Sequence, residues 1–138
     1  MGLFSGSRPE NLGATDGRLA PCKRTPNCVS SQADPATDAG HYTAPIRIAG
    51  SARDTWVVLR SVLQSLPRAS LVADKEYYLH AEFASRIVGF VDDVEFLLDE
   101  KAGVIHVRSA SRLGSSDFGV NRDRIETIRS RVAAAMKS

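Results

Sequence analysis

The sequence lacks a long apolar run, a marked excess of charge and more than two cysteines. No apolar stretch approaches the roughly 18 to 20 residues that span a bilayer, and the N-terminal residues lack the long apolar core of a secretory signal. A formal net charge of +2 is too small to attract nucleic acid or an anionic membrane by bulk electrostatics. We therefore expect no membrane span and no nucleic-acid partner. We expect the protein to be cytoplasmic, or periplasmic if a leader has been removed.

Complete catalytic and cofactor motifs are also missing. The sequence has neither the lysine-containing glycine loop of a Walker motif nor the glycine spacing of a dinucleotide-binding fold. Two cysteines with one nearby histidine, His41, fall short of the four ligands of a structural zinc site. We expect no metal and no cofactor, and no motif assigns a reaction.

Length and composition indicate one domain with a tail. A chain of 138 residues, 43% hydrophobic and 25% charged, is large enough for one core and too small for two. Residues 1–40 are rich in Gly, Pro, Ser, Asp and Asn and have almost no apolar period, which predicts an extended, cysteine-bearing arm lying on the domain. Residues 41–138 are predicted to form the domain itself.

Apolar periodicity within residues 41–138 predicts an α+β fold. A short strand at 42–48, limited to a sheet edge by Pro45, precedes a helix that starts near Ser51 and stops at Pro67. Residues 70–110 alternate between apolar and polar, which indicates antiparallel strands, and a second amphipathic helix follows from about Asn121, a good N-cap. The order strand, helix, four strands, helix predicts a curved antiparallel sheet of about five strands with both helices packed on one face.

The alternation leaves one face of the predicted sheet polar and ionisable. Leu79, Ala81 and Phe83 point to the apolar face. On most polar sheet faces, the side chains form cross-strand pairs that are exposed to solvent. The alternative is that the carboxylates and histidines on this face transfer protons. The polar face carries Tyr78, His80, Glu82, Asp93, Glu95, His106 and Arg108.

The segment 108–124, here called the 108–124 corner, is the densest cluster of chemistry-bearing residues. It holds four arginines, four serines and two glycines between the last strand and the last helix. Arginine forks bind carboxylate or phosphate, and glycines let backbone amides approach a ligand near a helix N-terminus. This favours an anion-binding corner. The alternative is an internal role, in which Arg112 pairs with Asp117 and the serines satisfy backbone groups.

Cys22 and Cys28 flank a short loop that contains Pro26. A disulfide here is sterically reasonable and would pin the arm, whereas a reducing cytoplasm would keep both residues as thiols. The sequence leaves both states open.

The chain resembles a known family over nearly its whole length. The resemblance is carried by Cys22, by the segments 26–32, 89–96 and 105–112, and by Gly114, Asp117, the segment 119–122, Ile125, Glu126, Ile128 and Arg129. These residues look like the bacterial and plastid family catalogued as domain of unknown function 1499. The resemblance implies a cysteine-bearing arm and an arginine-rich corner, and no established activity, substrate or cofactor. Some members of that family carry exported or membrane-attached leaders.

We predict a small non-catalytic module that binds a small anionic molecule or an acidic partner segment through the 108–124 corner. Arg108, Arg112 and Arg124 would supply positive charge, Asp117 would hold one arginine in place, and Asn121 would present the helix start.

Two alternative functions use other residues. The first is a small hydrolase or lyase-like enzyme in which His80 or His106 acts with Glu82 or Asp93 as acid and base. The second is a scaffold that docks a partner through the arm bearing Cys22 and Cys28.

Overall fold

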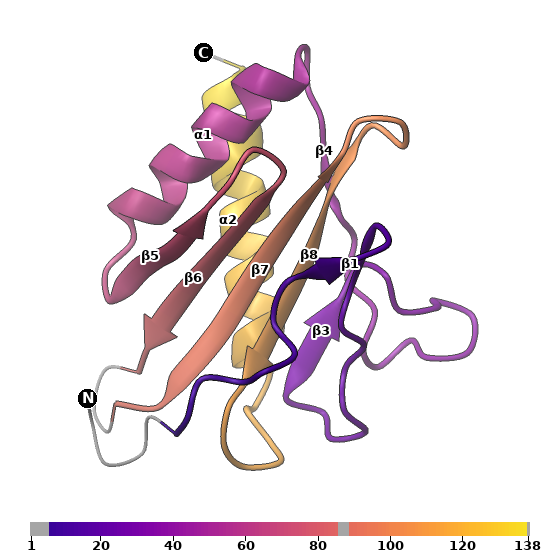
Figure 1. Cartoon of the computed structure of the whole chain (residues 1–138), viewed down its shortest axis with the longest axis vertical. Coiled ribbons are helices and arrows are strands. Elements are labelled where there is room, and N and C mark those ends of the chain that lie inside the picture. Colours follow the sequence, from indigo (N-terminus) through magenta and orange to yellow (C-terminus); the bar gives the residue numbers. More distant parts are fainter. Residues whose placement is uncertain (1–5, 86–88, 138) are drawn as a thin grey trace.

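Two helices cover one face of a mostly antiparallel sheet in the computed structural model, which describes residues 6–85 and 89–137 (Figure 1). The main sheet has six strands, with the order β3-β8-β7-β6-β5, and β4 pairs with β8 beside β3. The elements are β1 (Ala14–Thr15), β2 (Arg18–Leu19), β3 (Cys28–Ser30), β4 (Ile46–Arg47), α1 (Ala52–Ser65), β5 (Ala69–Asp74), β6 (Tyr78–Ala84), β7 (Val91–Asp99), β8 (Val104–Ser111) and α2 (Val120–Met136). The predicted α+β class, with two helices on an open sheet in one small domain, is confirmed.

The helix α1 begins where the sequence predicts. The Ser51 hydroxyl accepts a hydrogen bond from the backbone N–H of Asp54 at 2.9 Å, which satisfies one of the free amides of the first turn. Trp56, Leu59 and Leu63 recur at helical spacing and are buried against the sheet. The helix therefore forms because a good cap precedes one continuous apolar stripe.

The core lies between the helices and the apolar face of the sheet. Leu79, Phe96 and Val107 project from three neighbouring strands and pack with Ile125 and Ile128 of α2. All five side chains have no solvent exposure. The period-2 alternation of the strands thus places the apolar side chains as the sequence predicts. Among the described residues, no helix combines the length and the apolar character needed to cross a bilayer.

Part of the predicted arm belongs to the main sheet. Residues 28–30 form the edge strand β3, in which Val29 pairs with Ser109 of β8 and joins the core. The strand predicted at 42–48 is reduced to the two residues of β4, in keeping with Pro45, whose missing N–H cannot join a ladder. A separate two-stranded hairpin, β1 with β2, precedes β3.

The polar face of the sheet is covered rather than solvated. The segment 6–13, here called the N-terminal segment, crosses the face of the sheet opposite α2 (Figure 1). Arg8 pairs with Glu82 at 2.7 Å, and the backbone N–H of Gly13 donates to Glu95 at 2.8 Å. Glu95 consequently has no solvent exposure, and His80 only 3%. Most of the ionisable groups on this face are therefore shielded from solvent, where an unpaired charge would destabilise the fold.

Candidate functional site

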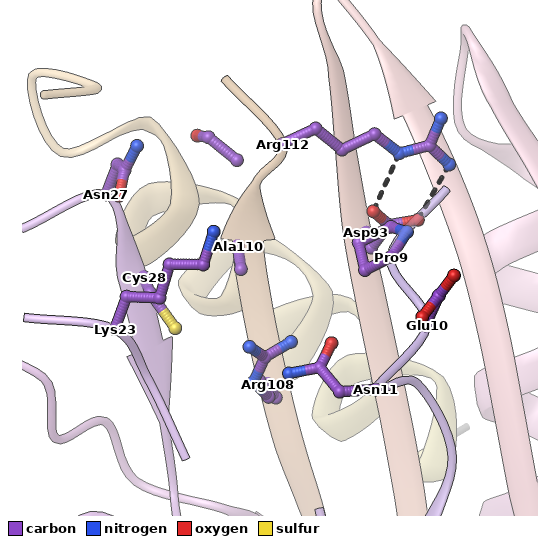
Figure 2. Close-up of a pocket in the computed structure, with 11 residues that line it drawn as sticks. Pro9, Glu10, Asn11, Lys23, Asn27, Cys28, Asp93, Arg108, Ala110 and Arg112 are labelled. Carbon is purple, nitrogen blue, oxygen red and sulfur yellow. Dashed lines mark hydrogen bonds and ion pairs between the residues drawn. The ribbon is translucent and has the colours of Figure 1, made fainter. Parts of the chain in front are cut away.

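A cavity of about 360 Å³ opens beside the shielded groups of the polar face (Figure 2). Its floor is β8, one wall is the N-terminal segment with Glu10 and Asn11, and the other wall is the loop 22–28, here called the cysteine loop, with Lys23. The charged and amide side chains that line the cavity are Glu10, Asn11, Lys23, Asn27, Asp93, Arg108 and Arg112.

Arg108 lies on the cavity floor and is only 5% exposed. Its Nη1 donates to Glu95 at 3.2 Å and its Nη2 donates to the carbonyl oxygen of Pro21 at 3.5 Å, which is the outer limit of a hydrogen bond. Its Nε finds no partner within residues 6–85 and 89–137. A guanidinium has five N–H donors, so Arg108 brings buried positive charge with spare donors to the cavity.

Glu95 holds Arg108 from beneath the cavity. Its carboxylate also accepts hydrogen bonds from the hydroxyl of Tyr78 and from the backbone N–H of Gly13. Burial, together with the hydrogen bond to Glu95, raises the pKa of Tyr78 far above its ordinary value. Tyr78 is thus a neutral donor at any physiological pH and serves to satisfy the buried carboxylate.

Arg112 is held much more firmly than Arg108. Its Nε and Nη2 donate to the two oxygens of Asp93 at 2.8 and 2.9 Å, and Nη2 also donates to Glu82. Only Nη1 is left without a partner in the part of the chain that the structure describes. The hydrogen bond to Asp93 raises the pKa of Arg112 further above its ordinary value. This fork-to-carboxylate pairing makes Arg112 a brace of the polar face as well as a lining residue.

Arg112 helps to lower the pKa values of the two neighbouring acids, Asp93 and Glu82. Burial alone would raise the pKa of Asp93, but the hydrogen bonds from Arg112 and His80 outweigh burial and hold that pKa below its ordinary value. For Glu82, burial also opposes ionisation, and the hydrogen bonds from Arg8 and Arg112 lower its pKa. Both carboxylates are therefore ionised near neutral pH and paired with arginine.

The candidate acid and base residues do not all come together. His80 Nε2 lies 2.8 Å from Asp93, on the same face as Glu82. His106 lies elsewhere, with its ring nitrogens 3.2 Å from Asp99 and 3.2 Å from the hydroxyl of Ser31. The structure thus groups His80, Glu82 and Asp93 and separates His106 from them.

The same group has the composition of a metal site. One ligand atom from each of His80, Glu82 and Asp93 lies within 4.8 Å of the others. However, Arg112 donates to both carboxylates, so a cation would have to displace a guanidinium that already balances their charge. This donor set does not support a metal centre.

Asp117 and Asn121 act differently from the prediction. Asp117 does not hold an arginine within the described residues. Its carboxylate accepts from the backbone N–H groups of Gly119 and Asn121 at 2.9 and 3.0 Å. The N-cap of α2 is Gly119, in a left-handed conformation, so Asn121 is not the N-cap. The helix starts earlier because the Asp117 side chain, two residues before the cap, supplies the acceptor that Asn121 was expected to provide.

Asn121 is instead a fully buried connector. Its amide group donates to the carbonyl oxygen of Asn27 at 3.2 Å, and its oxygen accepts from the hydroxyl of Ser109 at 2.6 Å. Arg124 pairs with Asp92 at 2.8 Å and lies over the ring of Phe83. Asn121, Arg124 and Asp117 do not line the cavity beside Arg108.

Cys22 and Cys28 are joined by a disulfide, with an S–S distance of 2.06 Å. The bond joins Cys28, the first residue of β3, to Cys22, which directly precedes Lys23. It therefore restrains the cysteine loop that forms one wall of the cavity. Sequence reasoning did not find Lys23, Glu10 or Asn11 as site residues. Their position depends on the path of an arm with no apolar period, and the only available signal was the short spacing of the two cysteines.

Comparison with known proteins identifies the family. Residues 18–132 match the model of the family described as Protein of unknown function (DUF1499), and the chain belongs to this family. No curated protein gives a significant match. Lys23, Arg108 and Arg112 lie within the matched residues, whereas Glu10 and Asn11 lie before them.

Proposed function

We propose that this member of the DUF1499 family is a non-catalytic binding module that holds a small anionic molecule in the cavity above Arg108. The observation that carries the proposal is the buried, loosely held Arg108 guanidinium on the cavity floor, whose Nη1 and Nη2 each make one long hydrogen bond. Each of these nitrogen atoms has a second N–H group, whereas Nε is shielded from solvent. A carboxylate or phosphate bound in the cavity would accept hydrogen bonds from the remaining N–H groups of Nη1 and Nη2.

Two further features support a small molecule as the ligand. The cavity, at about 360 Å³, is near the lower end of the 300 to 1,000 Å³ common for small-molecule sites. Lys23 adds a second positive charge on the wall, and no hydrogen bond or ion pair involves its ammonium group within the described ranges 6–85 and 89–137. A ligand that contacted both Arg108 and Lys23 would bring its negative charge beside two bases.

The geometry favours binding over acid–base catalysis. His80 contacts Asp93 but does not line the cavity. Asp93 is ionised and forms an ion pair with Arg112. A carboxylate whose pKa is lowered in this way is a weak general base. The pair is better suited to bracing the face than to moving protons.

The proposal is tested by titrating the protein with acetate and with inorganic phosphate while recording amide chemical shifts. We expect saturable shifts in residues 108–112 and near Lys23. Arg108→Lys keeps a charge opposite Glu95 but loses the planar fork, so it should bind about tenfold more weakly.

The matched controls are two lysine variants. Lys23→Gln should weaken anion binding severalfold. The control is Lys75→Gln, at another exposed lysine in the turn between β5 and β6, and this variant should bind like the unmodified protein. Linear, non-saturating shifts with both anions would reject the proposed function.

A further inference from the structure

The two walls of the cavity carry opposite free charges. Figure 2 shows Lys23 on the side of the cysteine loop and Glu10 on the side of the N-terminal segment, with β8 between them. Both residues are exposed. Among the residues that the structure describes, no hydrogen bond or ion pair involves the Glu10 carboxylate or the Lys23 ammonium group. Each charge is therefore available to a ligand.

The charges on the cavity floor are already balanced. Arg108 is matched by Glu95, and Arg112 is matched by Asp93, with Glu82 shared between Arg112 and Arg8. The floor therefore offers spare N–H donors without a large surplus of positive charge. Among the described residues that line the cavity, Lys23 and Glu10 carry the charges that these internal pairs leave unmatched, and the two have opposite signs.

This distribution discriminates between ligand classes. A simple anion would gain from Arg108 and Lys23 but would be repelled by Glu10 on the opposite wall. A molecule with a carboxylate at one end and an ammonium group at the other would satisfy both walls. Binding sites gain specificity in this way, by attracting one ligand and repelling its near relatives.

We infer that the cavity selects a small zwitterion, such as an amino acid, whose carboxylate is bound by Arg108 and Lys23 and whose ammonium group is bound by Glu10. This inference rests on the proposed function and deepens it by naming the ligand class. The neutral Asn11 amide, beside Glu10 on the same wall, adds a donor and an acceptor without changing the charge balance.

The two halves of the site differ in their relation to the family. Arg108 and Lys23 lie inside the residues that match the family model, whereas Glu10 precedes them. The anion half of the site is thus built on the matched domain, and the ammonium half is added by the N-terminal segment. Because Glu10 is exposed and lies outside the braced layer, it can be changed without disturbing the fold.

The experiment compares ligands that differ in one charge. Calorimetric or amide-shift titrations would use propionate, alaninamide, and the zwitterions alanine, β-alanine and 4-aminobutyrate, whose charges are separated by increasing distances. We expect at least one zwitterion to bind about tenfold more tightly than propionate, the size of one added charge-assisted hydrogen bond. Alaninamide, which has no carboxylate, should bind more weakly than that zwitterion.

Two variants assign the preference to Glu10. Glu10→Gln should abolish the advantage of the zwitterion and should tighten binding of propionate, because the repulsion is removed. Glu76→Gln, an exposed acid in the turn between β5 and β6, should change neither affinity.

The possible failures are distinguishable. If propionate binds as tightly as every zwitterion, and Glu10→Gln alters neither, the zwitterion inference is wrong while the proposed anion site stands. If propionate, inorganic phosphate and all three zwitterions fail to bind saturably, the proposed function fails and the inference fails with it.

Discussion

Arg112 grips Asp93 with two parallel hydrogen bonds, from Nε at 2.8 Å and from Nη2 at 2.9 Å, and each side chain is only 2% exposed. The same Asp93 carboxylate accepts a hydrogen bond from His80, and the same Arg112 donates to Glu82. This pair joins the end of β8 to β7 and β6 across the polar face. The pair therefore gives the 108–124 corner a structural role at the point where it joins the sheet.

Arg112→Met should destabilise the fold strongly. The substitution leaves the Asp93 carboxylate buried without its main partner, and removing one member of a buried ion pair costs roughly 3–5 kcal/mol. Urea denaturation would measure the loss in the free energy of unfolding. Arg131→Met, at an exposed position of α2, is the control and should change it by less than about 0.5 kcal/mol. A loss of similar size in both variants would remove the bracing role from Arg112.

Stability should decline in acid. Asp93, Glu82 and Asp117 have folded pKa values below their ordinary values of 3.8, 4.5 and 3.8. Their contributions are fully present above those ordinary values and are lost as pH falls through the lower folded values. The free energy of unfolding should therefore begin to fall below about pH 5 and should keep falling below pH 3.8.

One carboxylate in this set can be isolated by mutation. For Asp117, burial opposes ionisation, while hydrogen bonds from Asn121 and Gly119 outweigh it and lower the pKa. Asp117→Asn retains an oxygen acceptor at the start of α2 but does not titrate. Urea denaturation across the acid range should show a smaller loss than in the unmodified protein. An identical loss in both proteins would mean that Asp117 does not contribute to the acid dependence.

The sequence was sufficient for the elements that have a clear period. Leu79 and Phe96 alternate with polar neighbours, and Leu59 and Leu63 repeat at helical spacing, so the facing of each element could be predicted. The strand β3 could not be predicted in this way. Residues 28–30 are too few to show a period, and their pairing with β8 depends on residues 78 to 82 positions further along the chain.

The candidate site was partly predictable for the same reason. Arg108 and Arg112 stand out in an arginine-rich segment, but their partners come from neighbouring strands. Proximity in sequence suggested Asp117 as the partner of Arg112, whereas strand pairing brings Asp93 beside it, because Asp93 lies opposite Ala110 in the sheet. Glu10 reaches the cavity through the path of the N-terminal segment, which no local pattern specifies.

The disulfide should stabilise the cysteine loop and the cavity wall. A cross-link over a sequence separation of six restricts the unfolded chain and contributes about 2 kcal/mol in the chain-entropy model. Reducing agent should therefore lower the Tm of the oxidised protein by roughly 5 to 10 °C. A Cys22→Ala/Cys28→Ala double variant should be indifferent to reductant. Alkylation of the oxidised protein before reduction should label neither cysteine, and prompt labelling would contradict the bond.

The backbone conformation of Phe118 should lower the stability of the fold. Its backbone is left-handed, with φ 53°, and its side chain is 97% exposed. The left-handed conformation costs a residue with a Cβ roughly 1–2 kcal/mol, whereas glycine adopts it freely. Phe118→Gly should therefore raise the free energy of unfolding by up to about 1 kcal/mol, since the relief of strain exceeds the greater entropy of glycine in the unfolded chain.

The matched variant for Phe118 is Leu113→Gly. Leu113 is an exposed apolar residue in the same loop but has no positive φ. Glycine at this position relieves no strain and adds unfolded-state entropy, so urea denaturation should show a loss of stability of about 0.5–1 kcal/mol. Opposite signs for the two glycine variants would locate the strain at Phe118. A loss in both would mean that the exposed ring makes a contribution to folding that its geometry does not reveal.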